Sequence, residues 1–440
     1  MDYSTTTKLF AAILLLLNFS SILVAQEKSS LHMCGHEIHM NQMEAKIPGY
    51  KKQIDKVFGL AKQRGSRSVR SNDIYRIPVV VHIVWNRPEE NLHDSLIINQ
   101  IEVLNQDFRL SNPDRDNVRE IFKERQSDTR IEFELKEIIR VKTSATFIPL
   151  LITLPDEVKK SSEGGSDASD TEFALNIWVC KIQPVPFLGA QILGYAYPPA
   201  DLPNWPAGVA ASSPELDGVV VDFRCFGRNN PLDSLLPAGM SLGPQGRTTT
   251  HEVGHYLGLR HIWGDGSLLG GSSCNADDGV EDTPNQGRQS NSDCNANQNT
   301  CTDVADDEPD MIENYMDYSD QACQNTFTKG QMEIMRGVLE GPRNGLLQLN
   351  TSTAVELSNS HLKIYPNPAQ HALHILNHTD LGITELKIFN QLGVEMLSMA
   401  SEQFSGENIT LELADWNPGL YIVKAKDSHQ KYITLKFIKI

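Results

Sequence analysis

Residues 250–261 read THEVGHYLGLRH, and the spacing of the polar side chains in this stretch governs the interpretation of the whole chain. On a helix, His251 and His255 lie one turn apart on the same face, so their imidazoles can bind one metal ion. A glycine after the second histidine permits a sharp turn that would bring back His261 as a third ligand. Three neutral nitrogen ligands leave one coordination position open, and Glu252 lies where it can activate water without binding the metal. The sequence therefore predicts one catalytic zinc ion.

Two other interpretations of this stretch are a helix with exposed histidines and no metal, and a structural zinc site. A structural zinc would not need Glu252 and normally takes a fourth protein ligand. The predicted mechanism is metal-assisted hydrolysis of peptide bonds in proteins or peptides, with Glu252 as the general base. The rival from another functional class is an adhesion or inhibitor-like protein that keeps the metal site without turnover.

Length and composition indicate a globular protein of two or three domains. The chain has 440 residues, of which 40% are hydrophobic and 22% charged. Its formal net charge of −17 argues against nucleic acid or an anionic membrane as a partner, since either would need a basic surface. Residues 26–72 differ from the rest, because they carry nine Lys or Arg and four Asp or Glu, a net charge of +5.

The N-terminus has the pattern of an export signal. Lys8 precedes an almost wholly apolar run over residues 9–24, and Ala25 is small enough for cleavage, which predicts a signal peptide over residues 1–25. The alternative is an uncleaved N-terminal anchor. No later segment is apolar enough to span a bilayer. We therefore expect a secreted protein without an integral membrane span, either released or retained at the cell surface.

Export permits disulfide bonds, and the chain has seven cysteines. Four of them fall in a stretch rich in Gly, Asn and Asp, where disulfides would supply rigidity that regular structure does not. Cys180 and Cys225 lie on separate predicted strands and form either a third bridge or two buried thiols. An odd total leaves at least one thiol unpaired, and Cys34 is the isolated one.

Hydrophobic patterns predict an α/β unit with a mixed sheet. Residues 96–108 have helical spacing, and residues 264–324 are loop-like and acidic until a capping-box pattern at Thr328 starts another helix. The predicted strands are β-branched or apolar runs at residues 75–85, 131–135, 174–180, 193–197 and 218–223. The strand at 193–197 would form the rim of the cleft and pair with an extended substrate.

The last 80 residues differ in character and predict a small all-β sandwich. Their short alternating strands are expected at residues 362–365, 372–376, 385–389, 409–413, 420–425 and 432–439. The arginines of residues 63–71 indicate an exposed, protease-sensitive linker at the end of the basic segment. The resulting organisation is a signal peptide (1–25), a pro-segment (26–72), a catalytic domain (73–347), a linker (348–360) and a β-sandwich (361–440).

The zinc motif is followed by ENYMDY at residues 313–318, and this combination resembles the metzincin clan of metallopeptidases. LGLRHIWG at residues 257–264 and YMDY at 315–318 resemble the pappalysin family, in particular its ulilysin-like branch. The resemblance covers residues 75–347. It implies an α/β (α+β) metzincin-type catalytic domain with a mixed twisted sheet and a zinc-binding active-site helix, and it implies endopeptidase activity.

The same resemblance assigns further residues. Met316 would form the floor beneath the zinc, and Tyr318 would stabilise the oxyanion, the alternative for Tyr318 being a packed aromatic ring. Two disulfides are implied, Cys274–Cys301 and Cys294–Cys323. The acidic loop at residues 277–283 offers hard oxygen ligands, and relatives hold structural calcium there. We therefore expect a calcium ion with the ligands Asp278, Glu281 and Thr283, the alternative being a solvated acidic loop.

Two positions bear on specificity and regulation. Gln321 stands where family members that cleave before basic residues have an acid, so a preference for Arg or Lys is in doubt and Gln321 is the candidate S1′ residue. Cys34 precedes Gly35 and resembles the family's latency motif, although Met33 replaces the usual arginine. A thiolate of Cys34 on the zinc would keep the enzyme silent until the pro-segment is removed. The alternative is an incidental cysteine in a discarded segment.

The C-terminal domain resembles the sorting domain of the type IX secretion system. The resemblance rests on LKIYPNP at residues 362–368, on NQLG at 390–393 and on PGLYIV at 418–423. It implies that residues 361–440 are an address recognised by secretion machinery at the outer membrane. The alternative is a carbohydrate-binding β-sandwich, although few aromatic residues are available to stack on sugars.

Overall fold

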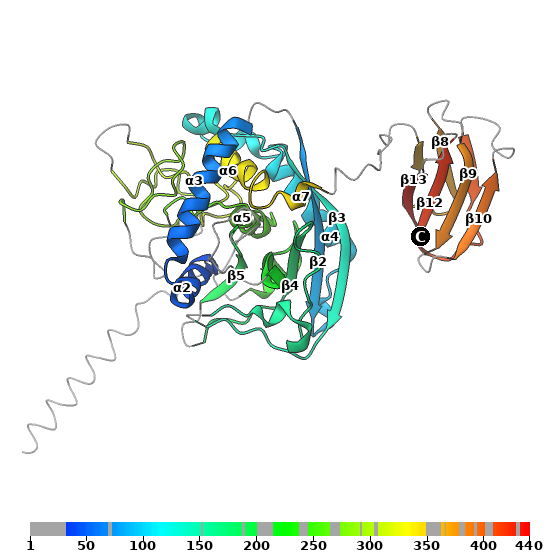
Figure 1. Ribbon diagram of the computed structural model, residues 1–440, viewed down its shortest axis with the longest axis horizontal. Helices are drawn as coiled ribbons and strands as arrows, with labels where there is room; N and C mark the ends of the chain where they lie inside the picture. Colours follow the sequence, from blue (N-terminus) through cyan, green and yellow to red (C-terminus); the bar gives the residue numbers. More distant parts are fainter. Residues whose placement is uncertain are drawn as a thin grey trace, which may run out of the picture. The chain divides into compact units, whose positions relative to one another are not determined.

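The computed structural model divides into two compact units, residues 1–350 and 351–440, which are considered separately (Figure 1). The structure describes residues 32–68, 73–150, 153–186, 190–199, 214–236, 245–264, 273–290, 293–302, 307–348, 362–365, 367–377, 383–390, 394–400, 408–427 and 432–440.

A six-stranded mixed sheet forms the framework of the first unit. In spatial order its strands are β1 (His32–Cys34), β5 (Gln191–Ala196), β6 (Val219–Asp222), β4 (Leu175–Cys180), β2 (Tyr75–Trp85) and β3 (Ile131–Lys142). Strands β3, β2, β4 and β6 are parallel to one another, whereas β5 is antiparallel to β6 and β1 is parallel to β5. The predicted mixed sheet is confirmed.

Helices and short 3₁₀ segments surround this sheet. The helices are α2 (His36–Lys46), α3 (Tyr50–Ser68), α4 (Asp94–Phe108), α5 (Arg247–Tyr256), α6 (Lys329–Leu339) and α7 (Gly345–Gln348). The 3₁₀ segments are Pro88–Glu90, Arg115–Asn117, Glu120–Arg125, Asp156–Lys159, Ser161–Glu163, Pro214–Leu216, Phe223–Cys225 and Asp233–Leu235.

The central strands are buried as their composition predicts. Parallel strands covered on both faces are expected to be continuous apolar runs, and residues 79–84 of β2 and all residues of β4 and β6 are buried. The predicted helix at Thr328 is also present, since the side chain of Thr328 accepts a hydrogen bond from the backbone N–H of Gln331 and the Gln331 side chain completes the capping box.

Helix α5 lies inside the unit rather than on its surface. All ten of its residues are buried, and it packs against β5, β6 and α4. This placement holds the histidine-bearing helix between the edge of the sheet and the other helices.

The predicted pro-segment has more structure than its sequence indicates. Strand β1 joins the sheet edge, and helices α2 and α3 follow it. The linker expected at residues 63–71 is wrong for residues 63–68, because α3 continues to Ser68. Residues 69–72 lie outside the described part of the chain. The physical reason is a tertiary contact, since α3 packs along α6 (Figure 1).

The second unit consists of two antiparallel sheets, as predicted. One sheet has the order β10 (Glu395–Ala400), β9 (Ile383–Asn390), β12 (Gly419–Asp427) and β13 (Tyr432–Lys439), and the other has β11 (Asn408–Glu412), β8 (Ala372–Asn377) and β7 (Leu362–Tyr365). Strand β10 was not expected from the sequence. The buried core includes Leu373, Ile388, Val423 and Phe437.

Several expectations lie outside the described residues. These are the signal peptide at residues 1–25, the linker at 348–360 apart from Gln348, and most of the turn at 390–393. Among the residues that the structure describes, no helix is long and apolar enough to cross a membrane.

Candidate metal centre

Three imidazole rings converge at the end of α5. His251 and His255 are on the helix, and the chain reverses at Gly258, whose φ of +93° lies in the left-handed region that glycine adopts without strain. This turn places His261 against the other two. The Nε2 atom of His255 lies 3.1 Å from Nε2 of His251 and 3.2 Å from Nε2 of His261.

Hydrogen bonds on the far side of two rings fix which nitrogen faces inward. Nδ1 of His251 lies 2.7 Å from the carbonyl oxygen of Tyr315, and Nδ1 of His255 lies 2.8 Å from that of Leu259. A carbonyl only accepts, so each Nδ1 carries the proton and each Nε2 points a lone pair at its neighbours.

This donor set fits a tetrahedral metal ion. Zinc–nitrogen bonds of 2.0–2.1 Å would set the nitrogens about 3.3 Å apart, close to the observed spacing. Facing lone pairs at this distance would repel one another without a cation between them. The Cys34 sulfur belongs to the same cluster, since one ligand atom from each of the four residues lies within 4.8 Å of the others.

The segment beneath the helix supports this cluster. Met316 is fully buried under α5, where a Cβ atom added to Gly254 would lie 2.5 Å from the Met316 sulfur. The preceding residue supplies the carbonyl that orients His251. Met316 therefore lies where the sequence analysis expects the floor of the site.

A buried charge network anchors the start of α5. The Arg247 guanidinium lies 3.4 Å from Asp107 and 2.7 Å from Asp114, and the side chains of Arg247 and Asp107 are fully buried. Thr250 and Tyr315 each donate a hydroxyl hydrogen bond to Asp107. Burial raises the pKa of Asp107 while Arg247 and these donors oppose the shift. Sequence analysis missed this network, because its members lie up to about 200 residues apart.

Glu252 faces the sheet edge beside the histidines. It is 1% exposed, and a Cβ atom added to Gly194 of β5 would lie 2.7 Å from Cγ of Glu252. Burial raises the pKa of Glu252 to about 8. A cation at the histidine cluster would lower this pKa by favouring the charged form.

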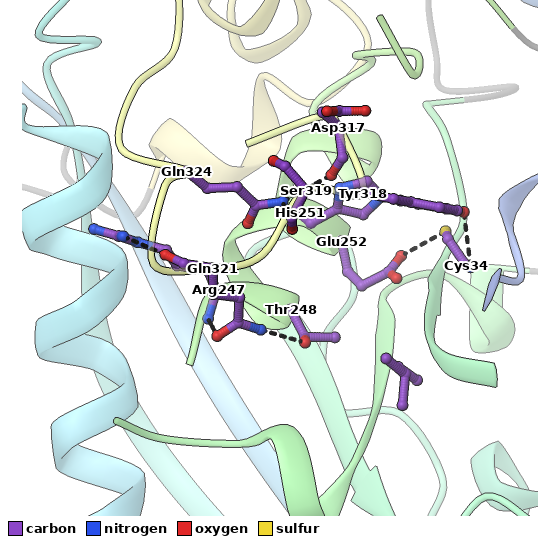
Figure 2. Close-up of a pocket in the computed structure, with 11 residues that line it drawn as sticks. Cys34, Arg247, Thr248, His251, Glu252, Asp317, Tyr318, Ser319, Gln321 and Gln324 are labelled. Atoms are coloured by element: carbon purple, nitrogen blue, oxygen red, sulfur yellow. Dashed lines mark hydrogen bonds between the residues drawn. The ribbon is translucent and has the colours of Figure 1, made fainter. Parts of the chain in front are cut away.

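Cys34 and Tyr318 meet in front of Glu252 (Figure 2). The Cys34 thiol lies 3.4 Å from Glu252 Oε2, and the Cys34 backbone N–H donates to the Tyr318 hydroxyl at 2.8 Å. Strand β1 and the bond from Gly35 N–H to the Gly194 carbonyl hold this segment along β5. Burial and the Glu252 carboxylate raise the pKa of the Cys34 thiol, so a cation is needed to make it a thiolate.

A cleft of about 390 Å³, including the part open to solvent, lies beside this cluster. Gln321 lines it and is held at both ends of its amide (Figure 2): its oxygen accepts from the Arg247 N–H at 3.1 Å, and its nitrogen donates to the Thr248 hydroxyl at 3.0 Å. The wall of the cleft at Gln321 is therefore an uncharged amide that two hydrogen bonds hold in place.

Comparisons with known proteins agree with this geometry. A family model described as pregnancy-associated plasma protein-A matches residues 238–340, and one described as a secretion system C-terminal sorting domain matches residues 363–440. A promirolysin mutant from Tannerella forsythia is 36% identical, with a TM-score of 0.58 over 72% of this chain and 98% of that one. Mature Tannerella forsythia mirolysin with a cleaved peptide is 38% identical, with a TM-score of 0.53 over 64% of this chain and 98% of that one. The chain belongs to the pappalysin family of metallopeptidases.

Curated relatives point the same way. An extracellular metalloprotease of Arthroderma benhamiae is 29% identical over 259 residues, which is 58% of this chain and 69% of the relative. This pappalysin-family chain is thus a secreted metalloprotease with a C-terminal sorting domain, and the promirolysin match shows that it is similar to a zymogen.

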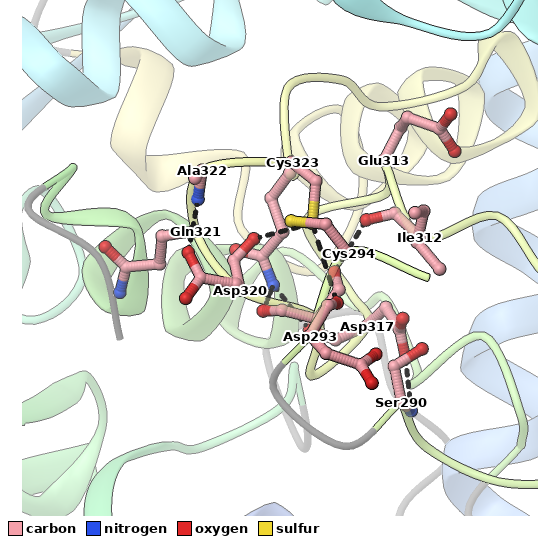
Figure 3. The surroundings of a disulfide bond; sticks show 12 residues. Ser290, Asp293, Cys294, Ile312, Glu313, Asp317, Asp320, Gln321, Ala322 and Cys323 are labelled. Atoms are coloured by element: carbon pink, nitrogen blue, oxygen red, sulfur yellow. Dashed lines mark hydrogen bonds between the residues drawn. A yellow bond between two sulfur atoms is a disulfide. The ribbon is translucent and has the colours of Figure 1, made fainter. Parts of the chain in front are cut away.

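The loop that carries Gln321 is joined by disulfides in this pappalysin chain. The structure links Cys274 to Cys301 and Cys294 to Cys323, the pairing that the family resemblance implies. Cys323 lies two residues beyond Gln321, and its N–H donates to the Asp320 carbonyl (Figure 3). Cys180 and Cys225 are buried thiols, which answers the alternative left open by the sequence.

The acidic loop brings together only some of the expected calcium ligands. Asp278 is 2% exposed and accepts hydrogen bonds from Thr283 Oγ1 at 3.0 and 3.1 Å, and burial raises the pKa of Asp278. The Glu281 side chain is 90% exposed and pairs with Lys62 of α3 at 3.0 Å. The structure therefore places Asp278 beside Thr283 and turns Glu281 toward helix α3.

Two residues that follow Cys34 also reach the histidine cluster, and sequence analysis did not single them out. The His36 ring stacks on His255 with centroids 4.1 Å apart, and Glu37 Oε1 lies 3.9 Å from His261 Nδ1. The only signal for them in the sequence is their place directly after Cys34-Gly35.

Proposed function

We propose that this metalloprotease is a zinc-dependent endopeptidase made as a latent precursor, with His251, His255 and His261 as the protein ligands of one catalytic zinc. The observation that carries the proposal is the convergence of three Nε2 atoms beside a buried carboxylate and a buried thiol. A zinc ion bound there would supply Lewis acidity, which acidifies water and polarises a scissile carbonyl.

The chain's own residues perform the remaining steps. The Glu252 carboxylate accepts a proton from the attacking water and later passes it to the leaving amine. The Tyr318 hydroxyl, which in the latent form accepts a hydrogen bond from Cys34, would donate one to the oxyanion once the pro-segment has left. The edge of β5 that now pairs with β1 would bind an extended substrate by main-chain hydrogen bonds.

Latency follows from the position of Cys34. Its sulfur lies within ligand range of the three histidines and next to Glu252, so a thiolate there would take the position that water needs. We infer that residues 26–72 are the pro-segment, residues 73–347 the catalytic domain and residues 361–440 the sorting domain, after a signal peptide (1–25) and before a short linker (348–360).

We also propose a structural calcium ion at the acidic loop. Asp278 and Thr283 place side-chain oxygens together, and the Val280 carbonyl lies 2.9 Å from Thr283 Oγ1. Such an oxygen-only set suits calcium. Glu281 would join it only by turning away from Lys62.

The first prediction concerns Glu252 and the metal content. Glu252→Ala should keep one zinc per chain while casein hydrolysis by the activated enzyme falls by about 10²–10⁴-fold, because the general base is lost. The exposed Glu120→Ala serves as the control and should retain full activity. Metal analysis of the same samples should find calcium as well, and its absence would contradict the proposed calcium site. A Glu252→Ala enzyme that cleaves casein at the parent rate, or parental cleavage unaffected by chelator, would contradict the mechanism. A zymogram in which the activated parent cleaves nothing would favour the adhesion alternative.

The second prediction concerns Cys34. Cys34→Ala should make the precursor active or prone to self-cleavage, because the thiol no longer occupies the metal, whereas Cys180→Ala, a buried thiol outside the cluster, should stay latent. In cobalt-substituted precursor, a thiolate charge-transfer band should be present in the parent and absent in Cys34→Ala. An inert, stable Cys34→Ala precursor would reject the latency mechanism, and so would a charge-transfer band that persists in this variant.

The third prediction concerns the S1′ residue. Because the pocket wall at Gln321 is a neutral amide, profiling on a peptide library should find no preference for Lys or Arg after the cleaved bond. Gln321→Asp should raise kcat/KM for such peptides about tenfold through a charge-assisted hydrogen bond. Asp320→Asn is the matched control. If the parent does prefer Lys or Arg after the cleaved bond, and Asp320→Asn loses this preference, then Asp320 and not Gln321 is the S1′ residue.

The fourth prediction concerns export. We infer that type IX secretion machinery recognises residues 361–440, which rests on the sorting-domain match. In a host that carries this machinery, a chain that ends at residue 360 should remain in the cell envelope, whereas inactive Glu252→Ala with its tail should reach the medium or cell surface. Normal export of the shortened chain with loss of polysaccharide binding would support the carbohydrate-binding alternative.

A further inference from the structure

The pro-segment touches the catalytic domain at a second place far from Cys34 in the sequence. Helix α3 lies along α6, with two glycines at the crossing (Figure 1). A Cβ atom added to Gly65 of α3 would lie 1.7 Å from the Glu333 carbonyl oxygen of α6, and one added to Gly337 of α6 would lie 1.9 Å from the Ala61 carbonyl oxygen of α3. The two helix backbones are therefore in direct contact.

Glycine is otherwise unfavourable at both positions. In a helix interior, glycine costs about 1 kcal/mol relative to alanine. Helix stability by itself would therefore favour alanine or a larger residue at both positions. Outside α6 itself, the three nearest atoms to a Cβ on Gly337 all belong to Ala61 of the pro-segment. The absence of a side chain at Gly337 thus serves the contact with α3. Gly59 differs, because it is exposed on the same helix and a Cβ there would meet nothing within 4 Å.

Polar contacts fix the position of α3 along this crossing. Arg64 donates to the Glu340 carbonyl just after the end of α6 at 2.9 Å, where the helix dipole favours a positive charge. Ser66 donates to the Glu333 carboxylate at 2.9 Å, and Lys62 donates to the Gly279 carbonyl at 3.2 Å. The basic pro-segment therefore docks on carbonyl and carboxylate oxygens of an acidic partner.

Apolar contacts extend the surface toward the metal centre. Val57 and Ala61 of α3 are 4% and 2% exposed. The Arg260 guanidinium carbon lies over the Phe58 ring, 4.4 Å from the centroid of that ring. Val57 also lines a small cavity together with Gly258, the turn residue of the zinc motif, and with Val338 of α6.

We propose that the face of α6 around Gly337 is a docking site for helix α3, which holds the pro-segment on the enzyme independently of Cys34. A cut between Ser68 and Asp73 would then leave the pro-segment bound and the active site blocked until that peptide is degraded or diluted. The proposal rests on the proposed latent function: α3 provides affinity, and by tethering Cys34 it raises the effective concentration of the thiol at the metal.

The test uses the full chain with residues 69–72 replaced by the recognition site of an added protease. After cutting, size-exclusion chromatography measures whether the pro-peptide co-elutes, and a peptide assay follows activity on dilution. The parent and Gly59→Ala should retain the pro-peptide. During dilution, Gly65→Ala and Gly337→Ala should lose the pro-peptide at a protein concentration at least about tenfold higher than the parent does. The reason is that the added methyl group would push the two helices apart.

Two controls separate the possible failures. Gly337→Ala enzyme freed of its pro-peptide should melt no lower than the parent, since alanine favours the helix once α3 is gone. Adding Cys34→Ala to the cut parent should give an active complex that still co-elutes with the pro-peptide. Retention of the pro-peptide by Gly65→Ala as firmly as by Gly59→Ala, or prompt release by the cut parent, would overturn the docking site. If the cut parent is active although its pro-peptide still co-elutes, the docking site stands, and the proposed blocking of the metal by Cys34 is contradicted.

Discussion

The mutual approach of three imidazole nitrogens is the constraint on which the rest of the structure depends. The Nε2 atoms lie 3.1–3.2 Å apart, and the Nδ1 protons of His251 and His255 are committed to carbonyls on the other side, so this arrangement is stable only around a positive charge. The left-handed turn at Gly258 makes the approach possible, and the carbonyls of Tyr315 and Leu259 fix the ring orientations. Fold and chemistry are therefore linked through two backbone carbonyls and one glycine.

Keeping this cluster in place requires a rigid helix in a buried setting. Arg247 and Asp107 are both fully buried at the start of α5, and breaking such a pair would cost about 3–5 kcal/mol. Arg247 also binds Gln321 through its backbone N–H and its guanidinium. Arg247 thus joins the base of the histidine-bearing helix to the cleft wall at Gln321, and the nearby Cys294–Cys323 disulfide limits how far that wall can move.

Features that depend on local periodicity could be predicted from the sequence. The spacing of His251, Glu252 and His255 requires only a helix, and the cap at Thr328 requires only four consecutive residues. The helical state of Gly65 could not be predicted, because glycine disfavours helices and the stabilising contact lies on α6. The pairing of Glu281 with Lys62 could not be predicted either, because it forms only when α3 is docked.

The proposed latency of this chain separates two physical tasks. The Cys34 thiol is buried beside Glu252, and both surroundings raise its pKa, so its bond to a metal must offset the cost of forming a buried thiolate. Near the metal, strand β1 on β5 and the His36 ring on His255 hold this ligand against competing water or substrate, and any further binding surface must come from elsewhere in the pro-segment. A helix docked on backbone atoms of α6 supplies that surface at a distance from the chemistry. Loss of the thiolate bond and loss of the pro-segment would then be separate events, the first governing access to the metal and the second the lifetime of the complex.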